Sequence, residues 1–220
     1  MGKYKLVCFD VDGTLVDNID YSWRLFHDFF QTDKHKREDA KNKFFNGEIS
    51  YLEWAEHDIG MWQELNSKKD DFFKAIENSD IKLMEGALEV LDKLKEKGMK
   101  LAIISGSLNV ILEKLFPGYE DYFDYIYFSK IFFDESGNIT KVDATEYDMD
   151  GKAEALKIIC EKEGIELSEC AFIGDHFNDV KICKEAGLGI AFNCKSDKLR
   201  KVCDVEIKGN NLRDMLKFVL

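Results

Sequence analysis

The sequence predicts an α/β fold, a Rossmann-like doubly wound parallel sheet that carries an inserted all-helical cap subdomain. Two observations support this prediction. Short apolar runs typical of buried parallel strands alternate along the chain with helical patterns. The stretch from residue 17 to residue 80 interrupts this alternation, because it holds no proline, only two glycines and all three tryptophans of the 220-residue chain.

The strands of the predicted sheet are short and apolar, and they are residues 5–9, 101–105, 125–128, 170–174, 189–193 and, more weakly, 202–207. Three helices with clear stop signals lie between them, at residues 85–97, 152–163 and 178–186, and a glycine follows each one. Residues 130–142 break the rhythm and predict a β-hairpin that turns at Ser136-Gly137-Asn138.

The helical stretch begins directly after the first strand. A simple connection from a strand to a helix is much shorter than this stretch, so the insert must be a subdomain of its own. We therefore expect a core domain of residues 1–16 and 81–220, with a helical cap of residues 17–80 placed over the end of the first strand. The cap aromatics recur at helical spacing, as in Trp23, Phe26 and Phe30, and are expected to form its core.

Composition excludes some partners. A net charge of −12 and an isoelectric point near 4.9 argue against nucleic acid and against an anionic membrane, since both require basic surface. The six cysteines form no CxxC pair and are expected to be reduced core residues. With no signal peptide and no apolar span in view, we expect a cytoplasmic protein. No pattern indicates an oligomeric state.

Two carboxylates follow the first predicted strand. Asp10 and Asp12 stand two residues apart, so both side chains point to one side of the strand. Their charges repel in a partly desolvated place unless a cation lies between them. The active site of an open α/β sheet lies at the carboxyl ends of its strands, so this pair is a candidate site.

Other strand ends carry matching chemistry. Ser105-Gly106-Ser107 follows the second core strand, "GDHFND" with Asp175 follows a later one, and Lys152 opens a helix. Asp10, Asp12 and Asp175 form a hard oxygen site suited to Mg²⁺. The turn at Ser105, the amides after it and the Lys152 ammonium are suited to phosphate oxygens.

Four motifs in order resemble those of the haloacid dehalogenase-like hydrolase superfamily: "FDVDGTL", "IISGS", "GKAEAL" and "GDHFND". Across residues 81–220 the order and spacing resemble the phosphoserine phosphatase branch, which also has a helical cap after its first motif. The resemblance implies a Mg²⁺-dependent phosphatase that hydrolyses a small phosphorylated metabolite through an aspartyl-phosphate.

The resemblance also implies a role for each acid. Asp10 would attack phosphorus, and Asp12 would protonate the leaving alkoxide and then deprotonate the attacking water. Mg²⁺ would be held by Asp10, the backbone carbonyl of Asp12 and Asp175, with Asp179 behind them.

The phosphoryl group would be held by Ser105, Gly106 and Lys152, with help from Asn178. These positions follow from the same motif matches. Their positive charge and hydrogen-bond donors would stabilise the negative charge that is delocalised over the phosphoryl oxygens in the transition state.

Some rival families differ in the first motif or in size. Dehalogenases of the superfamily lack the acid at the position of Asp12, ion-pumping ATPases have threonine there, and response-regulator receivers are about half as long and lack a cap. A phosphomutase, or a non-catalytic phosphate-binding protein of this fold, remains an alternative.

The cap departs from the phosphoserine phosphatase pattern. Ile19 stands where that branch has a substrate-reading glutamate, and Gly13 stands where it has serine. The candidate substrate residues are therefore Asp20, Arg24, Arg37 and His176. The run "KHKRED" around Arg37 is expected to be a solvated helix face rather than a substrate clamp.

Overall fold

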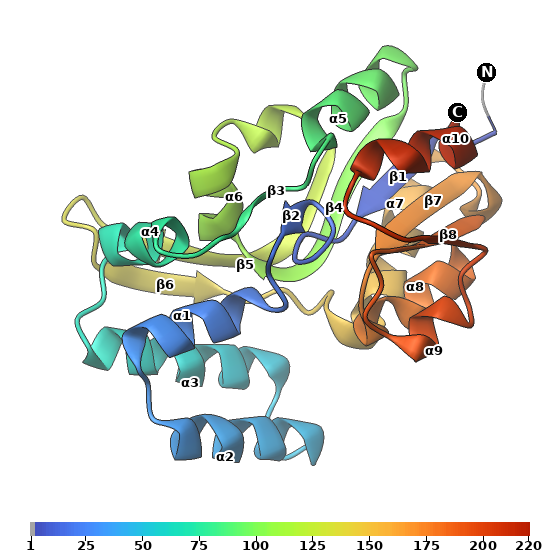
Figure 1. Cartoon of the computed structure of the whole chain (residues 1–220). Helices are drawn as coiled ribbons and strands as arrows, with labels where there is room; N and C mark the ends of the chain where they lie inside the picture. The colour runs from blue at the N-terminus through green and yellow to red at the C-terminus, as the bar shows by residue number, and fades with distance from the viewer. Residues whose placement is uncertain (1–2) are drawn as a thin grey trace.

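The computed structural model describes residues 3–220. At its centre is a seven-stranded sheet in the order β6-β5-β4-β1-β7-β8-β9, and all neighbouring strands are parallel except β5 and β6. The strands are β1 (Leu6–Phe9), β4 (Lys100–Leu108), β5 (Tyr125–Phe133), β6 (Ile139–Asp143), β7 (Cys170–Gly174), β8 (Leu188–Phe192) and β9 (Val205–Ile207) (Figure 1).

Helices cover both faces of the sheet. Alternate residues of β1 separate the two layers, because Val7 and Phe9 belong to one buried cluster and Leu6 and Cys8 to the other. The first cluster includes side chains of α5, α6 and the C-terminal segment, and the second includes side chains of α7 and α8. The core helices are α5 (Ala87–Glu96), α6 (Asn109–Leu115), α7 (Lys152–Glu163), α8 (Val180–Glu185), α9 (Asp197–Arg200) and α10 (Leu216–Val219). The predicted doubly wound fold is confirmed.

The predicted hairpin is also confirmed, since β5 and β6 pair antiparallel and Gly137 in the turn has a φ of 80°. One strand is longer than expected. The sequence predicts a strand of residues 101–105, whereas β4 continues through Ser105-Gly106-Ser107 to Leu108, and α6 begins at Asn109 without a side-chain cap.

The insert contains four helices, which lie to one side of the sheet in Figure 1: α1 (Ser22–Phe30), α2 (Lys34–Phe45), α3 (Tyr51–Glu64) and α4 (Lys69–Glu77). Their packing centres on Trp62, which is fully buried. Its ring lies 5.7 Å from that of Trp23, 5.9 Å from that of Phe26 and 5.3 Å from that of Phe72. These aromatics form the helical core that their spacing predicts.

A small antiparallel ribbon joins the insert to the sheet. Its strands, β2 (Val16–Asp17) and β3 (Lys82–Leu83), pair Val16 with Leu83 and Asp17 with Lys82. The Asn18 side-chain amide also donates to the Asp80 carbonyl at 3.0 Å. The ribbon lies at the two chain positions where the sequence places the domain boundaries, which stay a prediction.

The six cysteines are free, and Cys8, Cys160, Cys170 and Cys183 among them are buried. Within residues 3–220, no helix has both the length and the apolar character needed to cross a membrane.

Candidate active site

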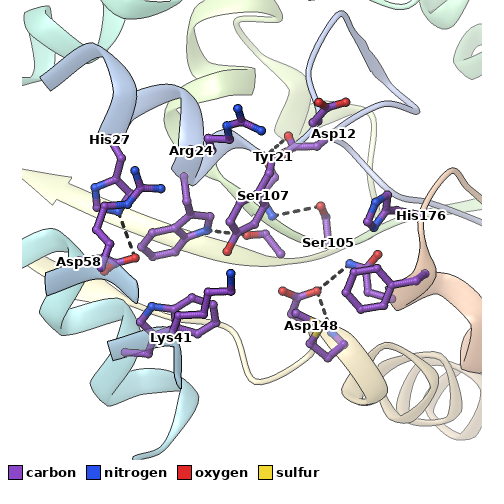
Figure 2. Close-up of a pocket in the computed structure, with 18 of the residues that line it drawn as sticks. Asp12, Tyr21, Arg24, His27, Lys41, Asp58, Ser105, Ser107, Asp148 and His176 are labelled. Atoms are coloured by element: carbon purple, nitrogen blue, oxygen red, sulfur yellow. Dashed lines mark hydrogen bonds and ion pairs between the residues drawn. The ribbon is translucent and has the colours of Figure 1, made fainter. Parts of the chain in front are cut away.

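A cavity of about 830 Å³ lies between the carboxyl ends of the strands and the helical insert (Figure 2). Strands β4, β1 and β7 are neighbours in the sheet, so the residues that follow them meet at one edge. Asp10, Ser105 and Asp175 line the cavity from this core side, whereas Trp23 and Arg37 line it from the insert.

Three buried acids gather on the core side. One carboxylate oxygen each of Asp10, Asp175 and Asp179 lies within 4.8 Å of the others. The fully buried Lys152 Nζ lies 2.8 Å from Asp10 Oδ1 and 2.6 Å from Asp179 Oδ1. Although burial alone lowers the pKa of Lys152, the charges of Asp10 and Asp179 outweigh it and raise that pKa. Lys152 is therefore a permanent cation between two carboxylates.

Asp175 has a carboxylate oxygen that accepts no hydrogen bond within residues 3–220. Its Oδ1 is buried and has no hydrogen-bond partner among the described residues. Burial, followed by the charges of Asp10 and Asp179, raises its pKa to about 8. Both oxygens of Asp179 are engaged, since Oδ1 meets Lys152 and Oδ2 accepts the backbone amides of Asp175 and His176. A set of hard carboxylate oxygens with one orphaned oxygen fits Mg²⁺, which prefers such ligands.

Asp12 lies apart from this group and is tied to the start of the insert. Its Oδ2 accepts the backbone amide of Ser22, the first residue of α1, at 2.7 Å, and its Oδ1 accepts the Ser107 hydroxyl at 2.7 Å. Burial raises the pKa of Asp12 to about 6, although these hydrogen bonds oppose the shift. A carboxyl that titrates near neutral pH suits general acid–base chemistry.

Two glycines leave room for acids of the site. Gly13 has a φ of 78°, and a Cβ there would stand 2.2 Å from Asp175 Oδ2. A Cβ on Gly106 would stand 2.3 Å from Asp148 Oδ2. Neither position accepts a side chain without displacing a carboxylate, so the departure to glycine at position 13 has a local cause.

Of the predicted phosphate residues, Ser105, Gly106 and Asn178 line the same cavity, whereas Lys152 is fully buried and does not line it. Ser105 is 1 % exposed, and its Oγ accepts the Ser107 amide at 3.1 Å. The carbonyl of Gly106 accepts Trp23 Nε1 from α1 at 3.0 Å. Asn178 donates through Nδ2 to Asp148 at 3.0 Å, while its Oδ1 is buried without a partner among the described residues.

The four candidate substrate residues also line the cavity. Asp20 stands at the rim, where it meets Lys195 Nζ at 2.6 Å. Arg24 and Arg37 both contact Asp28, at 3.3 and 3.5 Å. His176 is half-buried, and burial lowers its pKa. Their roles in binding stay predictions.

The run "KHKRED" forms the first half of α2, and one side of it faces the cavity through Lys34, Arg37 and Glu38. Five of its six residues are exposed, as expected of a solvated face, and Arg37 is half-buried. The sequence signal for a shared side was the spacing of Lys34, Arg37 and Glu38, because residues three and four positions apart lie on one side of a helix.

Sequence reasoning missed several cavity residues. Ser107 was visible in the Ser-Gly-Ser turn. Lys195 reaches the rim from the loop after β8 and lies 3.6 Å from Asp175 Oδ2. Asp148 precedes Lys152 in an irregular segment, and Asp58 lies on α3. The last three carry no motif, so only the folded chain identifies them.

Comparison with known proteins agrees with this geometry. The sequence profile of the haloacid dehalogenase-like hydrolases matches residues 4–187. The phosphoserine phosphatase of Methanocaldococcus jannaschii is 28% identical over 99% of this chain and 98% of its own length. That of Archaeoglobus fulgidus is 31% identical over 94% of this chain, which spans 58% of that protein.

Solved structures are similar over the whole length. A phospho-aspartyl intermediate analogue of phosphoserine phosphatase superposes with a TM-score of 0.74 and 26% identity, covering 99% of both chains. A substrate-bound phosphoserine phosphatase complex gives the same TM-score and identity over 100% of both chains. With its four motifs, its sheet topology and these relatives, the chain belongs to the haloacid dehalogenase-like hydrolases.

Proposed function

We propose that the protein is a Mg²⁺-dependent phosphatase that hydrolyses a small phosphomonoester through an aspartyl-phosphate on Asp10. One observation carries this proposal: Asp10, Asp175 and Asp179 converge within 4.8 Å around the buried Lys152 at the carboxyl edge of the sheet. The phosphatase relatives support it, and so does the similarity to a structure of a phospho-aspartyl intermediate analogue.

The first step forms the aspartyl-phosphate. One carboxylate oxygen of Asp10 attacks phosphorus, and the bond from phosphorus to the ester oxygen breaks. Asp12, whose pKa lies near 6, gives its proton to the departing alkoxide. Lys152 and the segment from Ser105 to Gly106 balance the charge that spreads over the phosphoryl oxygens.

The second step restores the enzyme. Asp12 is now ionised and takes a proton from a water molecule, whose oxygen attacks the phosphorus of the aspartyl-phosphate. The bond from phosphorus to Asp10 breaks, and inorganic phosphate leaves. The net reaction consumes one ester and one water and yields one alcohol and one phosphate.

Residues at the strand ends fit a magnesium ion. Asp10, the carbonyl of Asp12 and Asp175 would hold it, and Asp179 orients the amide of Asp175 from behind. When bound, Mg²⁺ offsets the repulsion between an anionic nucleophile and an anionic ester.

The named substrate of the relatives is phosphoserine, but residues 19 and 20 of this chain depart from the phosphoserine phosphatase pattern. Ile19 is 5 % exposed and apolar, and the neighbouring Asp20 is engaged by Lys195 at the rim. We therefore propose a small phosphorylated metabolite as the substrate class and do not assign phosphoserine as the substrate.

The test is phosphate release from p-nitrophenyl phosphate and a panel of small phosphomonoesters. Wild type and Asp10→Asn are compared, each with Mg²⁺ and with a chelator. We expect turnover only for wild type with Mg²⁺, at unchanged thermal stability of the variant with the chelator present. Conversion of an ester without release of inorganic phosphate would instead indicate a mutase. A folded wild type that turns over nothing would contradict the proposal.

A further inference from the structure

The cavity extends well beyond the proposed phosphate site. Aromatic side chains line this outer part: Tyr21 and Trp23 at the start of α1, Phe45 at the end of α2 and Trp54 on α3. Trp23 is 3 % exposed, and Trp54 Nε1 is buried without a partner among the described residues. In a phosphatase this space holds the leaving group, so its lining describes the chemistry of that group.

Two buried carboxylates also face this space. Asp58 is 6 % exposed and Asp148 is 5 % exposed, and both line the cavity (Figure 2). Among residues 3–220, no lysine or arginine nitrogen lies within 4.0 Å of either carboxylate in an ion pair. Buried charges normally have a cationic partner, and neither carboxylate has a lysine or an arginine of the described residues in that position.

The ion-pair partners of Asp58 in the described part of the chain are the histidines His27 and His57. Trp62 Nε1 can only donate, and it donates to His27 Nδ1 at 3.2 Å, so the His27 proton resides on Nε2. That nitrogen lies 3.0 Å from Asp58 Oδ2, and burial lowers the pKa of His27, although the contact with Asp58 opposes this shift. His57, the other neighbour of Asp58, is 37% exposed.

Asp148 is held by neutral donors. Tyr51 donates its hydroxyl to Oδ2 at 3.2 Å, and Asn178 donates to Oδ1 at 3.0 Å. Tyr21 lies close enough to feel both acids, because after burial the charges of Asp148 and Asp58 are the largest causes that raise its pKa. These neutral partners orient the carboxylate, and its charge also acts on Lys152, whose pKa it helps to raise.

Five lysine and arginine residues also line the cavity, and four of them have acidic partners. Figure 2 shows the Lys41 side chain extending into the cavity, and the Arg37 side chain is only 22% exposed. Arg24 and Arg37 share Asp28, and Lys195 meets Asp20. The remaining two belong to α2: Lys41 is 46% exposed and lies 3.4 Å from Glu38, and Lys34 is exposed. Four of these five basic residues therefore pair with Asp20, Asp28 or Glu38, whereas Asp58 and Asp148 form no ion pair with a lysine or arginine among residues 3–220.

From this lining we infer that the leaving group of the substrate carries a cationic nitrogen, an amine or a quaternary ammonium. The inference rests on the proposed function. The aromatic faces of Tyr21, Trp23 and Trp54 attract such a cation through their ring quadrupoles. Asp58 and Asp148 supply the opposite charge in a desolvated place, where it acts most strongly. In a phosphate ester of a short amino alcohol, the phosphate would lie at the proposed phosphate site and the amine in the aromatic part of the cavity.

The experiment compares kcat/KM for esters that differ in the charge of the leaving group. Phosphocholine and phosphoethanolamine carry a cation, glycerol 3-phosphate is neutral there, and 3-phosphoglycerate is anionic. We expect wild type to favour the cationic esters over glycerol 3-phosphate by about tenfold or more, and to use 3-phosphoglycerate least. p-Nitrophenyl phosphate serves as the reference ester.

Variants assign the preference to Asp58 and the aromatic lining. Asp58→Asn should lower the cationic preference, measured as the ratio of kcat/KM for phosphocholine to kcat/KM for glycerol 3-phosphate, by about tenfold. The matched control Asp28→Asn removes a rim carboxylate and should keep the preference. Because Asp58→Asn could disturb the packing around His27, Trp54→Leu provides a second test and should also reduce the cationic preference.

Each other outcome is decisive. Preference for 3-phosphoglycerate would overturn the inference and assign recognition to the basic side of α2. An equal loss for all esters in Asp58→Asn and Trp54→Leu would also overturn it, since both residues would then be structural. Turnover of p-nitrophenyl phosphate without a cationic preference rejects the inference and keeps the proposed phosphatase, whereas no turnover of any ester rejects the proposed function.

Discussion

The core wall and the cap wall of the cavity are built in different ways. Core side chains follow three neighbouring parallel strands, so the sheet itself brings Asp10, Ser105 and Asp175 to one edge. Cap side chains project from α1, α2 and α3, whose positions depend on packing around Trp62. The comparison teaches that backbone topology places the chemistry of the reaction, whereas side-chain packing places the recognition of the leaving group.

The two walls also differ in electrostatics. The core wall holds three acids with the fully buried Lys152 between two of them. The cap wall holds the pairs of Arg24 and Arg37 with Asp28 and the buried carboxylate of Asp58, and Asp148 of the core faces the same space. Changes to the core wall should therefore act on every ester, and changes to the cap wall should act on some.

The largest effect is expected for Asp12→Asn in the core wall. Loss of general acid–base catalysis should lower kcat by about 10²–10⁴-fold. p-Nitrophenolate leaves without protonation, so the first step survives better than the second with this ester. Rapid mixing should show a burst of p-nitrophenolate close to one per enzyme, followed by slow turnover. Steady turnover without a burst, at a similarly reduced rate, would assign Asp12 to the first step alone.

The next effect concerns Lys152. Lys152→Met leaves Asp10 and Asp179 buried without their shared cation and should cost about 3–5 kcal/mol of unfolding free energy. The matched control is Lys195→Met at the half-exposed rim, with an expected cost within about 1 kcal/mol. Urea unfolding of both variants in chelator measures the difference. Equal costs would contradict the contrast between the walls.

Magnesium should couple stability to pH. The pKa values of Asp12 and Asp175 are raised from 3.8 to about 6 and about 8, so their protonated forms stabilise the metal-free fold. That stabilisation is lost as the pH rises through 6 and then 8, where ionised Asp175 is free to bind the cation. Saturating Mg²⁺ should add about 2.7 kcal/mol at a concentration of 100 Kd.

This gain should be larger at pH 8 than at pH 5, where protons compete with the metal. Melting temperatures at the two pH values, with Mg²⁺ and with chelator, measure it. Asp175→Asn is the control and should remove most of the Mg²⁺-dependent shift. A shift at pH 5 as large as that at pH 8 would show that these carboxyls do not hold the ion.

The smallest effect is expected where the walls touch. Trp23→Phe keeps an aromatic ring against Trp62 but removes the hydrogen bond from Nε1 to the Gly106 carbonyl. The expected cost is about 1 kcal/mol of stability, with a several-fold loss of kcat/KM for all esters and a larger loss for cationic esters, because a phenyl ring attracts a cation less strongly than an indole. A loss confined to cationic esters would make Trp23 purely a recognition residue. Unchanged stability and kinetics would show that the bond has no role.

Much of the fold follows from the sequence because buried parallel strands are continuous apolar runs and glycines end the helices. The ribbon of β2 and β3 escaped prediction, since two-residue strands carry no period. The core candidates could be chosen because Asp10 and Asp175 follow predicted strands. Asp58 and Asp148 could not, because the direction in which an inserted helix or an irregular loop presents a side chain depends on contacts distant in the sequence.

The ribbon has a mechanical consequence. The chain enters and leaves the helical insert through two hydrogen-bonded strands, Val16–Asp17 and Lys82–Leu83, and Asn18 ties the same junction to Asp80. Two separate linkers would let the two chain ends of the insert move independently. Because β2 and β3 are paired, these two ends move together. We expect a rotation of the insert about this junction to change the distances from Trp23 to Gly106 and from Tyr51 to Asp148 together. Such a rotation would couple the selection of the ester to access to its phosphorus.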